Sequence, residues 1–240
     1  RVATDLEVRG ELALHLRADG GTRGDAGGRI GNWSDQSGSK HPASQPAGPE
    51  FRPVLIHDAI HGRPAIHFDG QRRYMQLAGQ VITSRQFTVL AVVNNRGAQR
   101  HRQILSNFSA DDHQSVTAAF LGLDAAKTIR FTDHLSVASN TLQAGQPFLL
   151  TAINGKYGAA VYHNDTPLVS QEAPLEIGKL DTPWVIGRQG GVDGQYWHGD
   201  MAEIIVYDRE LPTAELHEVW RYLSHRYQLP LSITAEREPP

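Results

Sequence analysis

Short apolar segments recur along almost the whole chain, and Gly, Asn, Asp or Pro separates each segment from the next. In residues 12–16 (LALHL) leucines alternate with other residues, a period of two that is typical of a strand. Residues 87–93 (FTVLAVV) are apolar on both faces, which predicts a central strand buried on both sides. Many short strands with frequent turns are typical of a sandwich or jelly roll and not of a parallel sheet. We therefore expect an all-β, two-sheet antiparallel jelly-roll sandwich whose core takes Phe87, Val89, Ala91 and Val93 or the residues between them.

Only one segment of the chain has a strong helical period. Pro212 and Thr213 open it, and Pro230 follows its end. Its apolar residues recur at steps of three and four, a spacing that gathers them on one face of a helix. We expect a single C-terminal helix that begins near Pro212 and packs on the sandwich through Leu216, Val219, Trp220, Leu223 and Tyr227.

The composition of the chain excludes several classes of protein. Its 240 residues carry a formal net charge of −3, so no global field would draw it onto nucleic acid or an anionic membrane. No apolar run approaches the length of a transmembrane helix, and we expect no membrane insertion. The chain has no cysteine, which excludes a disulfide framework, a thiolate zinc site and a cysteine nucleophile.

The two ends of the chain have the character of a fragment. The first residue is Arg1 instead of Met, and the closing residues TAEREPP have the composition of a linker. We interpret the chain as part of a longer polypeptide whose targeting signal lies elsewhere. The expected organisation is an N-terminal linker at 1–9, one sandwich domain at 10–229 and a C-terminal linker at 230–240.

Five sequence fragments are informative when they are taken in order: LALHLRAD (12–19), WSDQSG (33–38), GRPAIHFDG (62–70), WHGDMAEI (197–204) and VYDREL (206–211). In order and spacing they resemble bacterial laminin-G-like (concanavalin A-like lectin/glucanase) jelly-roll modules over roughly residues 10–229. The resemblance implies two packed antiparallel sheets, and relatives that include lectins, polysaccharide-binding modules, adhesion domains and some glycan-cleaving enzymes. It also implies an extracellular or cell-envelope location within a multidomain protein whose other domains would be neighbours.

Catalytic patterns are missing from the sequence. Retaining hydrolases of this superfamily resemble one another in a strand that carries Glu-x-Asp-x-x-Glu, and this chain has no such pattern. The nearest acidic group is Asp200, Glu203, Asp208 and Glu210, of which the first two, three residues apart, are expected to face opposite sides of a strand. The 12 histidines form no His-x-His or His-Glu-x-x-His pair. We therefore predict that the chain is not an enzyme.

Several relatives of this fold bind calcium through Asp side chains and backbone carbonyls. Asp35 and Asp69 are equally explained as turn residues, because each precedes or lies near a glycine. We expect no required cofactor and leave a structural calcium ion open. The basic segment Arg96, Arg100, His101 and Arg102 is interpreted as a solvated loop or a cradle for a carboxylate or sulfate. The candidate calcium ligands are Asp35, Asp69, Asp111, Asp112, Asp133 and Asp193.

The loop at residues 190–198 (GGVDGQYWH) is the best candidate for sugar binding. Sugar rings stack on exposed aromatic side chains beside polar groups, and this loop combines both with flexible glycines. The alternative for Trp197 is a place in the core just before a strand. Trp33, Trp184 and Trp220 are assigned to the core, with Trp33 anchoring the long polar segment 19–53, which we expect to be a loop. The candidate ligand-binding residues are Asp193, Tyr196, Trp197 and His198.

These observations favour a non-catalytic module that binds a polysaccharide or a protein ligand. Two alternatives stay open. One is a structural spacer that positions neighbouring domains, and the other is a divergent glycan hydrolase or lyase. Fold alone does not decide among them, because one fold hosts many functions.

Overall fold

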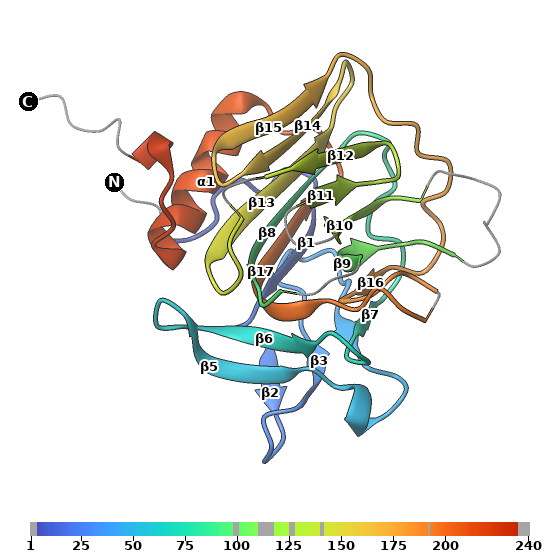
Figure 1. The fold of residues 1–240 in the computed structure, drawn as a ribbon, viewed down its shortest axis with the longest axis vertical. Helices are drawn as coiled ribbons and strands as arrows, with labels where there is room; N and C mark the ends of the chain where they lie inside the picture. The colour runs from blue at the N-terminus through green and yellow to red at the C-terminus, as the bar shows by residue number, and fades with distance from the viewer. Residues whose placement is uncertain are drawn as a thin grey trace, which may run out of the picture.

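The structure is a computed structural model that describes residues 4–97, 101–109, 118–124, 128–139, 142–191 and 193–234. Two antiparallel sheets pack face to face, and helix α1 (Thr213–Tyr227) lies on the side of the first sheet that faces away from the second (Figure 1). The expected two-sheet sandwich with one C-terminal helix is confirmed. None of the helices in the described residues has the length and apolar character needed to cross a membrane.

The first sheet has the order β15-β14-β13-β8-β17-β6-β5, and β1 pairs with β17 from outside this path. The predicted central strand is β8, which pairs with β13 on one side and β17 on the other. Every residue of β8 is buried. The strands are β1 (Leu12–Arg17), β5 (Val54–Ile60), β6 (Arg63–Asp69), β8 (Phe87–Asn95), β13 (Pro147–Asn154), β14 (Ala159–His163), β15 (Thr166–Gln171) and β17 (His198–Tyr207).

The second sheet has the order β12-β11-β10-β9-β16-β7-β4-β3-β2. Its first three strands in sequence come from the polar segment 19–53, which was expected to be a loop. They are too short and too rich in polar residues to show a strand period. The strands are β2 (Thr22–Gly24), β3 (Ile30–Trp33), β4 (Ala43–Ser44), β7 (Met75–Leu77), β9 (Arg102–Ser106), β10 (Phe120–Asp124), β11 (Thr128–Phe131), β12 (Leu135–Ala138) and β16 (Val185–Ile186), with short 3-10 helices η1 (Pro49–Phe51) and η3 (Ser232–Thr234).

Two hydrophobic clusters lie on the two faces of the first sheet. Between the sheets, the core takes the predicted set Phe87, Val89, Ala91 and Val93 of β8. The alternate residues of β8 face outward and pack against α1. The apolar stripe of α1 is buried there as predicted, because a strand apolar on both faces needs a cover on each. The outer cluster includes Leu90, Val92, Leu149, Ile205, Leu216, Val219, Trp220, Leu223 and Tyr227.

Parts of both expected linkers belong to the folded unit. Leu6 and Val8 are buried in the outer cluster, and so is Leu231. The linker interpretation is therefore wrong for these positions, because their apolar side chains extend the cluster under α1. Residues 235–240 lie outside the described residues, and the boundaries at 10 and 229 stay predictions.

Candidate ligand-binding surfaces

The loop between β16 and β17 carries all four predicted ligand residues and joins the two sheets. Its base is closed by a hydrogen bond from the Trp197 amide to the Gly187 carbonyl, 2.8 Å. Gln195 has a left-handed backbone with φ 51°, an uncommon conformation for a residue other than glycine. The backbone amide of Gln103 donates to the Gln195 carbonyl at 3.0 Å, and the Gln103 side-chain amide donates to the Gln195 side-chain oxygen at 2.6 Å. These two bonds to β9 hold the loop in place; Val192 lies outside the described residues.

Trp197 is the predicted ligand residue that the structure rules out. It is 0% exposed and belongs to the core between the sheets. The alternative interpretation, a core residue before a strand, is therefore correct. Because Trp197 points inward, it divides the other three residues into two groups, with Asp193 and Tyr196 on one side and His198 on the other.

Tyr196 lies in a cluster of polar and aromatic side chains beyond the end of β16, an inner strand of the second sheet. Its hydroxyl donates to the Asp193 carboxylate at 2.5 Å and also hydrogen-bonds to Arg188. The Arg188 guanidinium lies 3.7 Å from the centre of the Tyr74 ring, a close cation–π contact. We call Tyr74, Arg188, Asp193, Gln195 and Tyr196 the rim cluster.

The rim cluster is partly open to solvent. Tyr196, Arg188 and Gln195 are half-buried and Asp193 is exposed. Burial, aided by the bond to Asp193, raises the pKa of Tyr196 above its ordinary value of 10.0, against the opposing effect of Arg188. The Tyr196 hydroxyl therefore stays protonated and the ring stays neutral. Sequence reasoning missed Arg188 and Tyr74, since no spacing relates two residues so far apart in the chain.

His198 belongs to a different group, on the outer face of the first sheet. Its neighbour two residues on, Asp200, is cross-strand partner to His67 in β6 and Asn94 in β8. The His67 Nδ1 donates to Asp200 Oδ1 at 2.8 Å, while Arg96 Nε donates to Asp200 Oδ2 at 3.0 Å. Asn94 also donates to Oδ2, at 3.3 Å. We call His67, Asn94, Arg96, His198 and Asp200 the histidine cluster.

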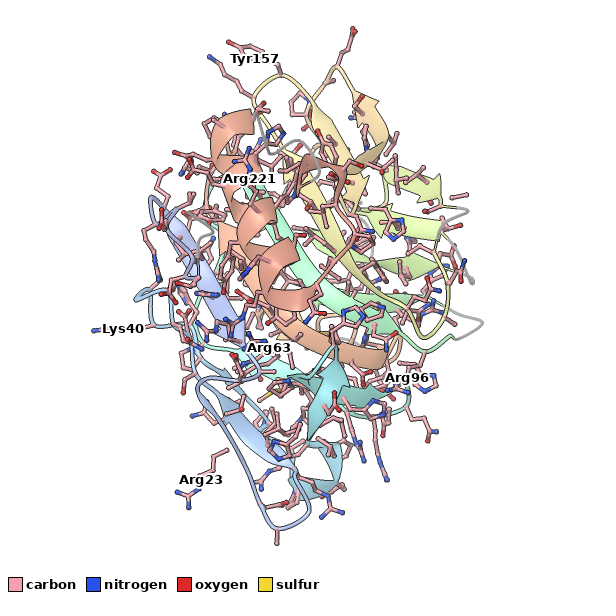
Figure 2. The ribbon with its side chains drawn as sticks, turned by 90° about the vertical axis from the view of Figure 1, so that its left-hand side faces the viewer. Arg23, Lys40, Arg63, Arg96, Tyr157 and Arg221 are labelled. Carbon is pink, nitrogen blue, oxygen red and sulfur yellow. The ribbon has the colours of Figure 1, made fainter. Side chains whose placement is uncertain are left out.

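Both imidazole rings of the histidine cluster have a defined orientation. His198 Nδ1 donates to the Gly97 carbonyl at 2.9 Å, and the two ring centres lie 6.5 Å apart. A carbonyl and a carboxylate only accept hydrogen bonds, so the Nδ1 atom of each ring carries the proton that it donates. The Nε2 atom of each ring takes no part in these bonds. Arg96 lies at the margin of the face that α1 covers, clear of the helix (Figure 2).

Asp200 is the charged centre of the histidine cluster, and its side chain is fully buried. Burial raises its pKa, but the hydrogen bonds from His67 and Arg96, together with the positive charge of Arg96, outweigh burial and lower the pKa below the ordinary value of 3.8. A carboxyl group whose pKa is lower in the folded protein stabilises the fold above its unfolded pKa. That contribution is lost as the pH falls through the folded pKa.

Asp200→Asn is therefore expected to lower the free energy of unfolding by about 2–3 kcal/mol at pH 7. The difference from the parent protein should shrink as the pH falls below about 4, where the parent loses the same contribution. Denaturant unfolding at pH 7, 5 and 3 measures this, with exposed Asp181→Asn as the control. A difference that stays constant from pH 7 to pH 3 would contradict the role assigned to the carboxylate.

Asp200 and Glu203 lie on the same face of β17, so the expectation that they face opposite sides is wrong. The register of β17 against β8 shifts between Met201 and Glu203, so that Ala202 is an extra residue. Such a β-bulge restores both carboxylates to one face. Asp200 pairs with Asn94 of β8 and Glu203 pairs with Val92. Asn94 and Val92 are two residues apart and therefore share a face of β8.

The pair still lacks the geometry for catalysis, because α1 covers Glu203. His15 Nε2 donates to its carboxylate at 2.7 Å, Tyr222 at 2.9 Å and Tyr227 at 2.8 Å. Arg226 lies 3.5 Å away, and the Glu203 side chain is 0% exposed. A carboxylate with these donors and no access to solvent can neither protonate a glycosidic oxygen nor attack a sugar.

The remaining acidic residues hold turns. Asp208 accepts from the amides of Thr83 and Ser84 at 2.9 and 2.8 Å, and Glu210 accepts from the amide of Lys156 at 2.9 Å. Both carboxylates therefore fix loops beside β17 and α1.

The candidate calcium ligands are engaged with protein groups where the structure describes them. Asp35 accepts from the amides of His15, Ser37 and His41, each at 2.9 Å. Asp69 Oδ1 likewise accepts from the amides of residues 71–73. Within the described ranges, no group of three or more His, Asp or Glu side chains could hold a metal ion. Asp133 is paired with Arg130 and Asp193 with Tyr196, while Asp111 and Asp112 lie outside these ranges, so calcium stays an untested prediction.

The basic segment does not form the single cradle considered from the sequence. Arg96 is paired with Asp200, whereas His101 Nε2 lies 2.9 Å from Asp124. Arg102 is buried, and Arg100 lies outside the described residues. The positive side chains therefore act in separate places.

A family model supports the fold from the sequence side. The model Laminin_G_3, described as the concanavalin A-like lectin/glucanases superfamily, matches residues 69–217. The chain belongs to this family, which confirms the resemblance found in its sequence fragments. The family's description covers both lectins and glucanases, so membership leaves catalysis undecided.

Solved structures of the same fold come from proteins that act on or bind other molecules. Domain 4 of AbnA, a GH43 extracellular arabinanase from Geobacillus stearothermophilus in complex with arabinotriose, matches with a TM-score of 0.59 and 14% identity, covering 87% of this chain and 97% of that one. Trypanosoma rangeli sialidase in complex with the inhibitor DANA matches with a TM-score of 0.59 and 14% identity over 86% of this chain. The binding domain of botulinum neurotoxin serotype D matches with a TM-score of 0.61 and 14% identity over 92% of this chain.

This chain spans 32% of the sialidase chain and 54% of the toxin chain. At such identities these likenesses show the fold alone. A search of curated proteins found no match.

Proposed function

We propose that this chain is a non-catalytic glycan-binding module of an exported multidomain protein, and that the rim cluster contacts the glycan. The observation that carries the proposal is the half-buried Tyr196 ring beside Arg188, which is itself fixed on Tyr74. A ring flanked by a guanidinium and by the carboxylate of Asp193 combines an apolar face with convergent polar groups. Such a combination suits a sugar, whose ring has an apolar face and a hydroxylated edge.

The comparisons support this class of ligand and this location. The arabinanase domain, nearly all of which this chain covers, belongs to an extracellular arabinanase and is described in complex with arabinotriose. The toxin match is described as a binding domain. A compact module of this shape within a larger exported protein fits both.

The absence of catalysis is supported by the two carboxylates of β17. Glycoside hydrolysis needs two carboxyl groups that flank the scissile bond, one of them able to give up a proton. Here Glu203 is covered by α1, and the Asp200 carboxylate is held ionised by His67 and Arg96. Neither can supply that proton.

Replacing Tyr196 with alanine is expected to weaken glycan binding about tenfold, or about 1.4 kcal/mol, because the stacking ring is lost. Tyr196→Phe should keep most of the affinity, since it keeps the ring and loses only the hydroxyl. A glycan array identifies a ligand for the 240-residue chain, and titration calorimetry then compares the variants. Tyr157→Ala is the matched control, because Tyr157 is 74% exposed on the distant β13–β14 hairpin.

Three results would change the proposal. Full affinity in Tyr196→Ala would move the site away from the rim cluster. Release of reducing ends from a polysaccharide by the pure chain would make it an enzyme. Binding to no glycan at all would favour a protein ligand or a structural spacer.

A further inference from the structure

We infer that the histidine cluster is a second contact site for the glycan, and that it selects neutral saccharides; this inference rests on the proposed function. The cluster lies at one end of the outer face of β17, and α1 covers the other end of the same face. Four of its residues lie on three neighbouring strands, β6, β8 and β17, which hold them more rigidly than loops would, and Arg96 directly follows β8.

Asp200 acts as the scaffold of this site. Its carboxylate accepts from His67, Asn94 and Arg96, and its side chain has no exposed area. A ligand therefore cannot reach Asp200 itself. The effect of the buried charge is to fix the orientation of the three donors around it.

The two imidazole rings of the cluster each have a nitrogen left over. His67 Nε2 and His198 Nε2 make no hydrogen bond within the part of the chain that the structure describes. Asp200 fixes the first ring and the Gly97 carbonyl fixes the second. The Asn94 side-chain oxygen is buried, so a ligand cannot reach it any more than it can reach Asp200.

Arg96 adds a donor beside these two acceptors. One edge of its guanidinium binds Asp200, and its side chain is 46% exposed, so the rest can bind a ligand. Hydroxyl groups match this set, because each donates one hydrogen bond and accepts others. A carboxylate or sulfate only accepts, so it would face lone pairs at His67 and His198. The chemistry therefore favours a neutral sugar with adjacent hydroxyls over an acidic one.

The Glu203 group on the same strand shows what a purely structural carboxylate looks like here. Both of its oxygens receive donors, its partners are covered by α1, and it is closed to solvent. The Asp200 group is instead open at His67, whose side chain is 24% exposed, and at Arg96. Stability alone does not require that opening.

The test is an NMR titration of the full chain with arabinotriose and cellotriose as neutral probes and trigalacturonate as the acidic probe. We expect the neutral probes to shift the ring signals of His67 and His198. Arg96→Ala and His67→Ala should each weaken the response at the cluster about tenfold, while Arg23→Ala, an exposed arginine of β2, should leave it unchanged. The cluster shifts should persist in Tyr196→Ala.

Each other outcome overturns the inference in a distinguishable way. Shifts confined to Tyr196 and Gln195, with full affinity in Arg96→Ala, would reject the second site and leave the proposed function intact. Shifts at the cluster with trigalacturonate alone would reject neutral saccharides as its ligand. No response to any probe, at either cluster, would reject the inference together with glycan binding.

Discussion

Glu203→Ala is expected to lower the free energy of unfolding by about 3–5 kcal/mol, because it removes the acceptor on which the buried donors under α1 converge. His15, Tyr222 and Tyr227 would each lose a hydrogen bond inside the fold. Burial, together with the Glu203 charge, raises the pKa of both tyrosines, so their hydroxyls stay protonated and cannot replace the lost charge. Arg226 would lose the nearby Glu203 carboxylate and keep its ion pair with Asp19.

Denaturant unfolding followed by circular dichroism measures this loss. The control is Glu218→Ala, an exposed glutamate on α1, which should change the free energy of unfolding by less than about 0.5 kcal/mol. Glu203→Gln keeps one oxygen acceptor and should fall between the two. Equal stability of Glu203→Ala and Glu218→Ala would show that α1 is held by its apolar stripe alone.

Trp33→Ala is expected to cost about 3–5 kcal/mol, since it removes a large, fully buried side chain and leaves a cavity. The indole also donates to the Arg17 carbonyl at 2.8 Å, which ties β3 to the end of β1. The thermal midpoint should therefore fall by several degrees. An unchanged midpoint would mean that the indole is exposed in solution and is itself available to a ligand.

The matched control for Trp33 is Tyr157→Ala, which removes an aromatic ring that is already 74% exposed. Its free energy of unfolding should change by less than about 0.5 kcal/mol. A large loss in this control would indicate that the β13–β14 hairpin contributes more to stability than its exposure suggests.

Local patterns of apolar residues could be interpreted from the chain alone. The helix from Thr213 was predicted because its apolar residues repeat at steps of three and four, and the strand from Phe87 because a short run is apolar on both faces. The burial of Trp33 was also predicted, since a long polar segment in a compact domain needs an apolar anchor. Trp197 was harder, because its neighbours Tyr196 and His198 are polar and favour a surface loop as readily as a core.

By itself, then, the sequence determined the family, the two-sheet fold and the single helix, all of which depend on patterns of neighbouring residues. Only the tertiary structure decided which side chains meet. Asp200 meets His67 across 133 positions and Arg96 across 104. Because Ala202 is an extra residue in β17, Asp200 and Glu203 lie on the same face of the strand instead of on opposite faces. Local periodicity cannot reveal such contacts, because strand register and bulges are set by the packing of the whole sheet.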